Sequence, residues 1–261
     1  MSRRLFGQDR QAERSEQQRL QTQLSGRFRE SFAASIRQTM REGADGYERN
    51  GEDALDASVR AHRAEVESTL RGDYESAWEV FSGRVLDGIE QRHGGRGRWQ
   101  RKDRTEEAVE EAKRQFIAEA LSDRVDKIMR TTRNQMRAII TRSIADGVGV
   151  DEIGRRIRNA APEIARARSE VIARTETHSA SMGAQNAAAE ASDVTVLKGW
   201  ISAGDDRTRD DEFDHVFADN EQIAVGELYQ ATGEPMRYPG DPNGSPGNII
   251  LCRCGEEYVT D

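Results

Sequence analysis

The stretch of sequence that decides the fold is residues 105–146, TEEAVEEAKRQFIAEALSDRVDKIMRTTRNQMRAIITRSIAD. Apolar residues recur in it every three or four positions, from Val109 to Ile144. Because an α-helix turns once in about 3.6 residues, this spacing places them along one face of a single long helix. Gly147 follows, and glycine readily takes the left-handed conformation that ends helices. The chain is therefore expected to be built around long amphipathic helices.

The N-terminal segment, residues 1–91, carries two further helical stripes, at 20–36 and at 59–89. Their apolar spacing is again that of one helix face. The pattern between them is interrupted by Gly43, Gly46 and Gly51. We predict a long helical arm of two helices joined by a loop, whose apolar stripes stay exposed in the free chain as docking surfaces.

A basic run at 92–104, RHGGRGRWQRKDR, has no apolar period, which predicts a loop. One interpretation is a solvated turn. The other is a nucleic-acid contact, in which cations bind phosphates and Trp99 stacks on a base. The candidate contacts are Arg96, Arg98, Arg101 and Lys102.

Residues 105–192 are predicted to be a helical region. Asp103 and Glu106 have the spacing of a capping box, in which each side chain accepts a hydrogen bond from a free backbone N–H at a helix start. Farther along, Asp151 is expected to cap a short helix. Pro162 suits the first turn of the next helix, because the N–H it lacks would have no partner there.

The C-terminal segment, residues 193–261, changes character. Apolar residues at 194–201 predict a β-strand, and shorter strands are expected at 223–225 and 249–251. The stretch 239–247, PGDPNGSPG, is expected to be an irregular loop. The predicted fold class is α+β, with an extended, mostly α-helical N-terminal region and a small C-terminal α+β domain.

Charge and composition exclude several classes of protein. The 261 residues have a net charge of -8, and from Asp205 onward 14 acidic residues face 4 arginines, so this end would repel a polyanion. We find no run of about 20 apolar residues and no signal-peptide core, which argues against a membrane or secreted protein. Cys252 and Cys254 are too close in sequence for an ordinary disulfide and are expected to be thiols in a reducing compartment.

Four short motifs follow one another in the C-terminal half of the chain. They are ARTET at 173–177, Trp200 with DDRTR at 205–209, YPGDP at 238–242, and CRC at 252–254. In this order and spacing they closely resemble the Mu F-like minor head proteins, or head morphogenesis proteins, of tailed bacteriophages. The resemblance covers roughly residues 140–261, whereas 1–139 match only in being helical. The family's histidine after the arginine-rich turn corresponds to His215.

The resemblance implies a structural protein of the virion, made in the host cytoplasm and placed in the phage head near the portal vertex. It implies a part in head assembly, DNA packaging or ejection, with the portal protein and capsid or scaffold proteins as partners and packaged DNA as a further contact. It implies neither an enzyme nor a membrane partner. The motif core comprises Trp200, Pro239, Asp241, Pro242, Cys252, Arg253 and Cys254.

The charged residues of these motifs invite a structural interpretation. Arg174 and Glu176 lie in a largely apolar helix, where a buried charge needs a partner. We therefore predict a charged network that locks this helix to the small sheet. Its other members would be Asp205, Asp206, Arg207 and Arg209.

The two cysteines have two interpretations. In a strand, Cys252 and Cys254 would point to one face and Arg253 to the other, since side chains alternate. With His215 or His178 they would form a plausible Zn²⁺ set, although structural zinc sites usually use a Cys-x-x-Cys spacing. We favour small buried core residues and no cofactor.

Two other classes of function remain open. A metal-dependent nuclease or a transferase would centre on Arg174, Glu176 and His215. A DNA-binding module would use the 92–104 run. Against an enzyme, the sequence has no phosphate-binding glycine loop, no His-Glu-x-x-His helix and no Gly-x-Ser-x-Gly elbow.

Overall fold

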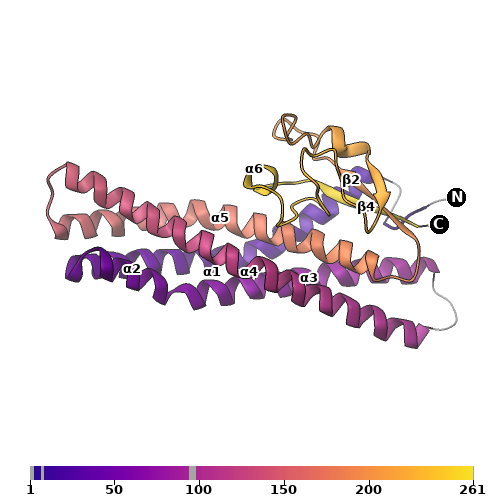
Figure 1. Cartoon of the computed structure of the whole chain (residues 1–261), viewed down its shortest axis with the longest axis horizontal. Helices are drawn as coiled ribbons and strands as arrows, with labels where there is room; N and C mark the ends of the chain where they lie inside the picture. The colour runs from indigo at the N-terminus through magenta and orange to yellow at the C-terminus, as the bar shows by residue number, and fades with distance from the viewer. Residues whose placement is uncertain (1–2, 7–8, 94–97, 261) are drawn as a thin grey trace. The chain divides into compact units, whose positions relative to one another are not determined.

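The computed structural model describes residues 3–6, 9–93 and 98–260. Five long or medium helices dominate the chain, and short strands are added near its ends (Figure 1). In chain order the elements are β1 (Arg3–Arg4), α1 (Arg10–Asn50), α2 (Glu52–Ala61), α3 (Arg63–His93), α4 (Arg98–Ala145), α5 (Val150–Glu190), β2 (Val196–Ile201), the 3₁₀ turn η1 (Phe217–Asn220), β3 (Gln222–Ala224), α6 (Pro246–Ile249) and β4 (Gly255–Thr260). The predicted α+β class, mostly helical with a small sheet, is confirmed.

These elements form two compact units. The sheet unit comprises Met1–Ser25, Asp73–Ile117 and Arg174–Asp261, and the helical unit comprises Gly26–Gly72 and Ala118–Ala173. The segments inferred from sequence, 1–91, 92–104, 105–192 and 193–261, follow one another along the chain. Both observed units instead combine segments that are distant in sequence.

The helical unit has an apolar interior and an ion-paired surface. Its buried residues include Phe32, Ile36, Met40, Leu55, Val59, Leu70, Met136, Ile140, Ile153 and Ile157. Burying each such side chain contributes about 1.5–3 kcal/mol, which makes this interior the main source of stability. At the surface Arg158 pairs with Asp45 and Glu48.

The predicted loop near Gly43 and Gly46 is wrong, because both glycines lie inside α1. A Cβ at Gly46 would stand 2.9 Å from the carbonyl oxygen of Ala54, and one at Gly43 would stand 2.9 Å from the sulfur of Met136. These glycines therefore permit close packing and do not end the helix. The chain turns only at Gly51, whose φ of 72° is left-handed, and the short helix α2 follows.

The apolar stripes of the N-terminal segment are not left exposed. Leu24, Phe32 and Ile36 keep at most 5% of their surface exposed, because they pack within the chain itself. The expectation that these stripes are free docking surfaces is therefore wrong. None of the described helices is both long and apolar enough to cross a lipid bilayer.

The predicted 92–104 loop is too long at both ends. Helix α3 continues to His93 and α4 already begins at Arg98. Asp103 consequently lies within α4 and does not start it. Residues 94–97, which include Arg96, lie outside the described residues.

The predicted helix boundary at Pro162 is also wrong, because α5 runs without a break from Val150 to Glu190. A proline inside a helix costs about 3 kcal/mol through a lost hydrogen bond and a steric clash. Ile157, Ala161 and Ala165 around it are fully buried. Packing of this face offsets the local cost, so the helix continues.

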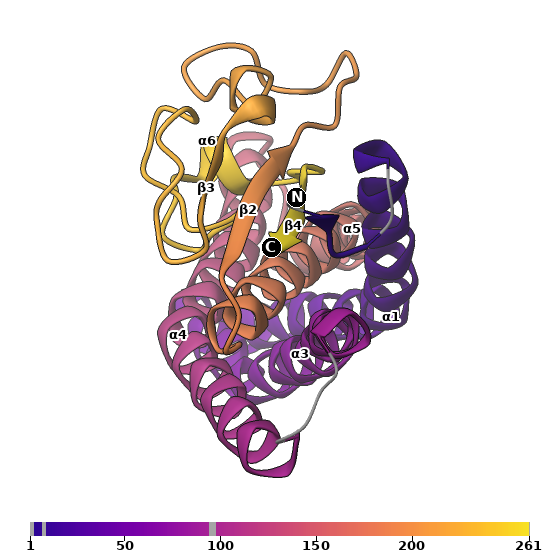
Figure 2. The same ribbon diagram turned by 90° about the vertical axis from the view of Figure 1, so that its right-hand side faces the viewer.

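The sheet unit holds a four-stranded antiparallel sheet in the order β1-β4-β2-β3. The predicted strands at 194–201 and 223–225 correspond to β2 and β3. The sheet lies beside the end of α5 and the start of α1 (Figure 2), where the Gln17 amide donates to Glu256 O at 2.7 Å and to Gln185 Oε1 at 3.2 Å.

Two strand predictions fail in this unit. Residues 249–251 are the end of α6 and a turn, and 252–254 form an irregular segment before β4. The strand that pairs with β2 is β4 itself, in which Trp200 lies opposite Glu256. The predicted irregular loop at 239–247 is confirmed up to Ser245, after which α6 begins at Pro246.

Candidate functional site

A buried cluster of sulfur and imidazole lies beside the sheet. The Cys254 Sγ is 3.4 Å from Nδ1 of His215, and the Cys252 Sγ is 3.8 Å from the same nitrogen. The three side chains are at least 95% buried, and their ligand atoms all lie within 4.8 Å of one another. The two thiols therefore converge on the imidazole of His215.

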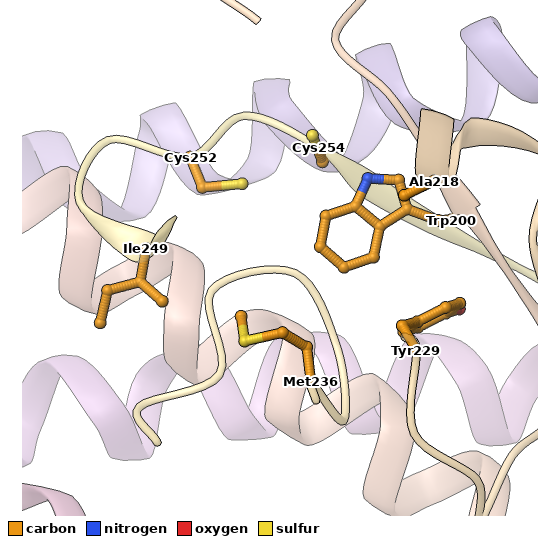
Figure 3. Close-up of a cluster of buried hydrophobic side chains, with 7 residues drawn as sticks. All are labelled: Trp200, Ala218, Tyr229, Met236, Ile249, Cys252 and Cys254. Carbon is orange, nitrogen blue, oxygen red and sulfur yellow. The ribbon is translucent and has the colours of Figure 1, made fainter. Parts of the chain in front are cut away.

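An uncommon backbone φ angle at Leu251 sets the direction of the segment that carries the cysteines. Leu251, directly before Cys252, has a φ of 56°, and its N–H donates to Oγ1 of Thr175 in α5 at 3.1 Å. Such a φ is rare outside glycine. Figure 3 shows both cysteines on this segment at the edge of a cluster that also contains Trp200. A turn fixed by α5, not a strand, thus directs both thiols inward.

The orientation of His215 is fixed by Asn248. The Asn248 amide nitrogen donates to Thr232 O at 3.3 Å and to Glu234 Oε2 at 3.1 Å, so its oxygen must be the acceptor. That oxygen lies 2.6 Å from Nε2 of His215. In the neutral imidazole the proton is therefore on Nε2, and the lone pair of Nδ1 points at the sulfurs.

The electrostatics of the cluster couple its members. A hydrogen bond with Cys254 most strongly lowers the pKa of the Cys252 thiol; burial opposes this, and the imidazoles of His178 and His215 lower it further. The same thiol–thiol hydrogen bond, together with burial, raises the pKa of Cys254. Burial disfavours protonation of His215, but its contacts with Cys252 outweigh this and raise its pKa.

Trp200 forms one wall of the cluster. Its ring packs edge-on against His215, with ring centroids 5.1 Å apart and an interplanar angle of 70°. The indole nitrogen lies on the edge toward Cys254 in Figure 3, and its N–H helps to lower the pKa of that thiol, as does the Ala203 backbone. The N–H is otherwise buried without a hydrogen-bond partner. Donors aimed at sulfur stabilise a thiolate.

His178, on α5, approaches the same cluster from the helix side. It is buried, its Nδ1 lies 3.3 Å from Oε1 of Gln21, and its Nε2 has no oxygen or nitrogen partner. A Cβ at Gly240 would stand 2.6 Å from Cδ2 of this ring, so the loop backbone packs directly on the imidazole. The ring is thus held in place with one nitrogen unsatisfied.

The charged residues of the turn at 205–209 have partners in the segment 247–253, and the predicted network with Arg174 and Glu176 stays a prediction. Asp205 accepts both guanidinium hydrogen bonds of Arg253, and this contact lowers the pKa of the carboxyl far below its usual range. Arg209 donates to the carbonyl oxygens of Gly247 and Ile250 at 2.5 and 2.6 Å. Arg207 lies 3.9 Å from Asp205, and Asp206 is exposed. The turn is therefore fastened to the segment around α6.

Glu176, one of the two helix residues of the predicted network, has a partner on α3. Glu176 accepts a hydrogen bond from the Tyr74 hydroxyl at 2.7 Å, and Thr177 donates to Asp73 at 2.8 and 3.0 Å. Burial raises the pKa of Asp73 to about 8, against the hydrogen bond from Thr177. Arg174 is half-buried. The ARTET helix is therefore fastened to α3, a partner that the motifs did not indicate.

The YPGDP loop is organised by one carboxylate. Asp241 is buried and accepts two guanidinium hydrogen bonds from Arg237, at 2.8 and 2.9 Å, and the backbone N–H groups of Arg237 and Asn243. Pro239 is buried and Pro242 half-buried beside it. This loop holds Gly240 against His178.

Sequence reasoning missed a second buried polar group. Lys198, on β2, donates to Oδ1 of Asn186 at 3.0 Å and to Arg237 O at 2.5 Å. Burial raises the pKa of Glu256 to about 7, while the nearby Lys198 charge and hydrogen bonds from Tyr258 and Tyr229 lower it. Charged residues in a strand usually mark a solvated face, so no signal in the sequence indicated this arrangement.

The candidate nucleic-acid contacts are only partly described. Arg98, Arg101 and Lys102 belong to α4, but the structure describes their backbone alone. The phosphate-contacting interpretation of this run stays a prediction.

The cluster of Cys252, Cys254 and His215 can do two kinds of chemistry. Thiolates and imidazole are preferred zinc ligands. A cysteine in contact with His215, which is itself in contact with Asn248, also resembles the nucleophile, base and orienting group of a cysteine hydrolase. Both thiols are almost completely buried, whereas a nucleophile must meet its substrate.

Part of the chain matches a known protein family. Residues 134–256 match the family model described as phage Mu protein F like protein, the family that the motifs resemble. The matched segment begins within α4 and ends in β4. No curated protein and no solved structure shows significant similarity to the chain.

Proposed function

We propose, on the premise that residues 134–256 match the phage Mu protein F-like family, that the chain is a structural minor head protein of a tailed phage. In this proposal it lies at the portal vertex, contacts the portal and the capsid or scaffold proteins, and acts in head assembly, DNA packaging or ejection. The family match is the observation that carries the proposal.

The placement of the motif residues supports a building role over a catalytic one. Cys252, Cys254 and His215 are buried, and Glu176 hydrogen-bonds Tyr74. An enzyme centred on Arg174, Glu176 and His215 would need these groups to reach substrate. Purified protein should therefore cleave no DNA with Mg²⁺ or Zn²⁺ present, and cleavage abolished by His215→Ala would establish the enzyme instead.

Contact with other head proteins would use exposed apolar side chains. In the helical unit, Ile144 is 60% and Val150 46% exposed, and in the sheet unit Phe217 is 72% exposed. Large exposed apolar residues are the ones whose burial in a complex gives the most free energy. They are the first candidates for the assembly interface.

The decisive experiment is to analyse purified particles by mass spectrometry and cryo-electron microscopy. The chain should be present in a fixed ratio to the portal protein, with density adjoining the portal. Complementation then locates the contact, because Ile144→Asp or Phe217→Asp should reduce incorporation without unfolding the protein. Asn134→Asp, also exposed on α4, is the matched control. Absence of the chain from particles would refute the proposal.

A further inference from the structure

We propose that Cys252, Cys254 and His215 bind a structural Zn²⁺ ion, with His178 as the fourth ligand, so that the ion fastens α5 to the segment that enters β4. The inference concerns side chains within the sheet unit. It does not depend on the proposed role in the phage head.

The spacing of the three converging atoms fits tetrahedral zinc. Zn–S bonds of about 2.3 Å and Zn–N bonds of about 2.0–2.1 Å give sulfur-to-nitrogen edges of roughly 3.6 Å in a tetrahedron. The Cys254 and Cys252 sulfurs lie 3.4 and 3.8 Å from His215 Nδ1. Binding therefore requires little movement of these three groups.

The one-residue spacing of the cysteines does not prevent ligation here. Structural zinc sites usually use a Cys-x-x-Cys spacing, and the shorter spacing was weighed for cysteines in a regular strand. Residues 252–254 instead lie outside β4 and follow the left-handed turn at Leu251. The turn lets the sulfurs of Cys252 and Cys254, which lie two positions apart on an irregular segment, approach one nitrogen.

The groups around His215 resemble the outer contacts of a metal site. A metal-bound histidine usually donates its second N–H to a fixed acceptor, which sets the ring's tautomer. Asn248 supplies that acceptor for Nε2, and its own amide is held by Thr232 and Glu234. The remaining lone pair, on Nδ1, is the one that faces the thiols.

His178 repeats this arrangement from α5. Its Nδ1 lies beside the Gln21 amide oxygen, while Nε2 is buried without an oxygen or nitrogen partner, and the imidazole interacts with the Cys252 thiol. A buried polar atom without a partner is costly, and coordination to a metal removes that cost. For the fourth bond, His178 Nε2 would have to move toward the ligand atoms of His215, Cys252 and Cys254, the three that already lie within 4.8 Å of one another.

Zinc binding would release the protons of the two cysteine thiols. Each thiol loses its proton to solvent, and the two thiolates neutralise the charge of Zn²⁺. A closed set of four protein ligands with no access for substrate is the pattern of structural zinc. Zinc binding would then add directly to the stability of the sheet unit.

Cobalt substitution tests the proposal on the intact chain. Reduced, metal-free wild-type protein should bind one equivalent of Co²⁺, with thiolate-to-cobalt charge-transfer bands and the visible bands of a tetrahedral site, and Zn²⁺ should displace it. Zinc-loaded protein should also melt at a higher temperature than the metal-free form. Failure of reduced wild-type protein to show the charge-transfer bands would overturn the proposal.

Variants assign the ligands. Cys252→Ser and Cys254→Ser should each weaken the charge-transfer bands, and His178→Gln should lower zinc affinity by about tenfold or more. Asn248→Ala, which removes the acceptor for His215, should lower it by about 10- to 100-fold. The other two histidines supply controls, since His62→Gln and His93→Gln should leave binding unchanged.

Two results would contradict parts of the assignment. Bands that persist unchanged in both cysteine variants would show a surface site and refute the cluster as the ligand set. Unchanged affinity in His178→Gln would remove His178 as the fourth ligand.

Discussion

The two units of this chain are stabilised in different ways. Among the described residues, the helical unit, 26–72 and 118–173, buries apolar side chains with a few polar ones such as His62 and Arg124, but no carboxylate, and its Arg158–Glu48 ion pair lies at the surface. The sheet unit also buries ionisable groups, among them Asp73, Lys198, His215 and Glu256. An apolar interior responds little to pH or metal, whereas buried titratable groups make stability depend on both. We therefore expect the stability of the sheet unit, which buries carboxylates, to depend more strongly on pH than that of the helical unit.

The largest expected effect is a pH dependence confined to the sheet unit. The folded pKa of Asp73 is about 8, above its ordinary value of 3.8, so the folded state binds more protons between these values. The free energy of unfolding should therefore fall as pH rises from about 4 to about 8, by on the order of several kcal/mol. Asp73→Asn should flatten this dependence.

Denaturant titrations followed by tryptophan fluorescence measure the effect. Trp78, Trp99 and Trp200 all belong to segments of the sheet unit, so the signal reports on that unit. An equal slope in wild type and Asp73→Asn would show that Asp73 is not the responsible group. A slope of the opposite sign would refute its raised pKa.

A medium effect should come from the close packing of the helical unit. Gly46→Ala places a methyl group 2.9 Å from the Ala54 carbonyl oxygen and should destabilise the protein by about 1–3 kcal/mol. Gly26→Ala, in the same helix with nothing within 4 Å, should instead stabilise it by up to about 1 kcal/mol. Thermal unfolding followed by circular dichroism distinguishes them. Two changes of the same sign would mean that helix propensity, and not packing, governs both sites.

The smallest effect should come from the surface ion pairs of the helical unit. Arg158 pairs with Glu48 at 2.5 Å, but its side chain is 35% exposed. Exposed pairs contribute about 0–1 kcal/mol, so Arg158→Gln should shift the unfolding free energy by less than about 1 kcal/mol. A loss of several kcal/mol would show that charges, and not the apolar interior, stabilise this unit.

The sequence predicted those parts of the molecule that depend on local periodicity. The long stripes became helices, and the apolar run around Trp200 became β2. The family resemblance also identified the chain segments that meet at the cluster. The zinc interpretation combined Cys252 and Cys254 with His215 or His178, although core residues without a metal were favoured, and the structure places His215 beside both cysteines.

Features that depend on distant contacts could not be predicted. Strand β4 reads GEEYVT, and its glutamates suggest a solvated segment, yet Glu256 is buried because Tyr229 and Tyr258 donate to it. Pro162 remains inside a helix because packing outweighs its local preference. Asn248 lies in a loop whose composition indicates only a turn, so its role toward His215 appears only in three dimensions.

The backbone at Leu251 has a consequence for how this protein can change. A leucine held at a φ of 56° stores about 1 kcal/mol or more of conformational strain that glycine would not have. Its side chain is 38% exposed, so removing it leaves only a small void. Laboratory evolution under selection for heat resistance should therefore exchange this leucine for glycine or asparagine early, while leaving the neighbouring Cys252 untouched.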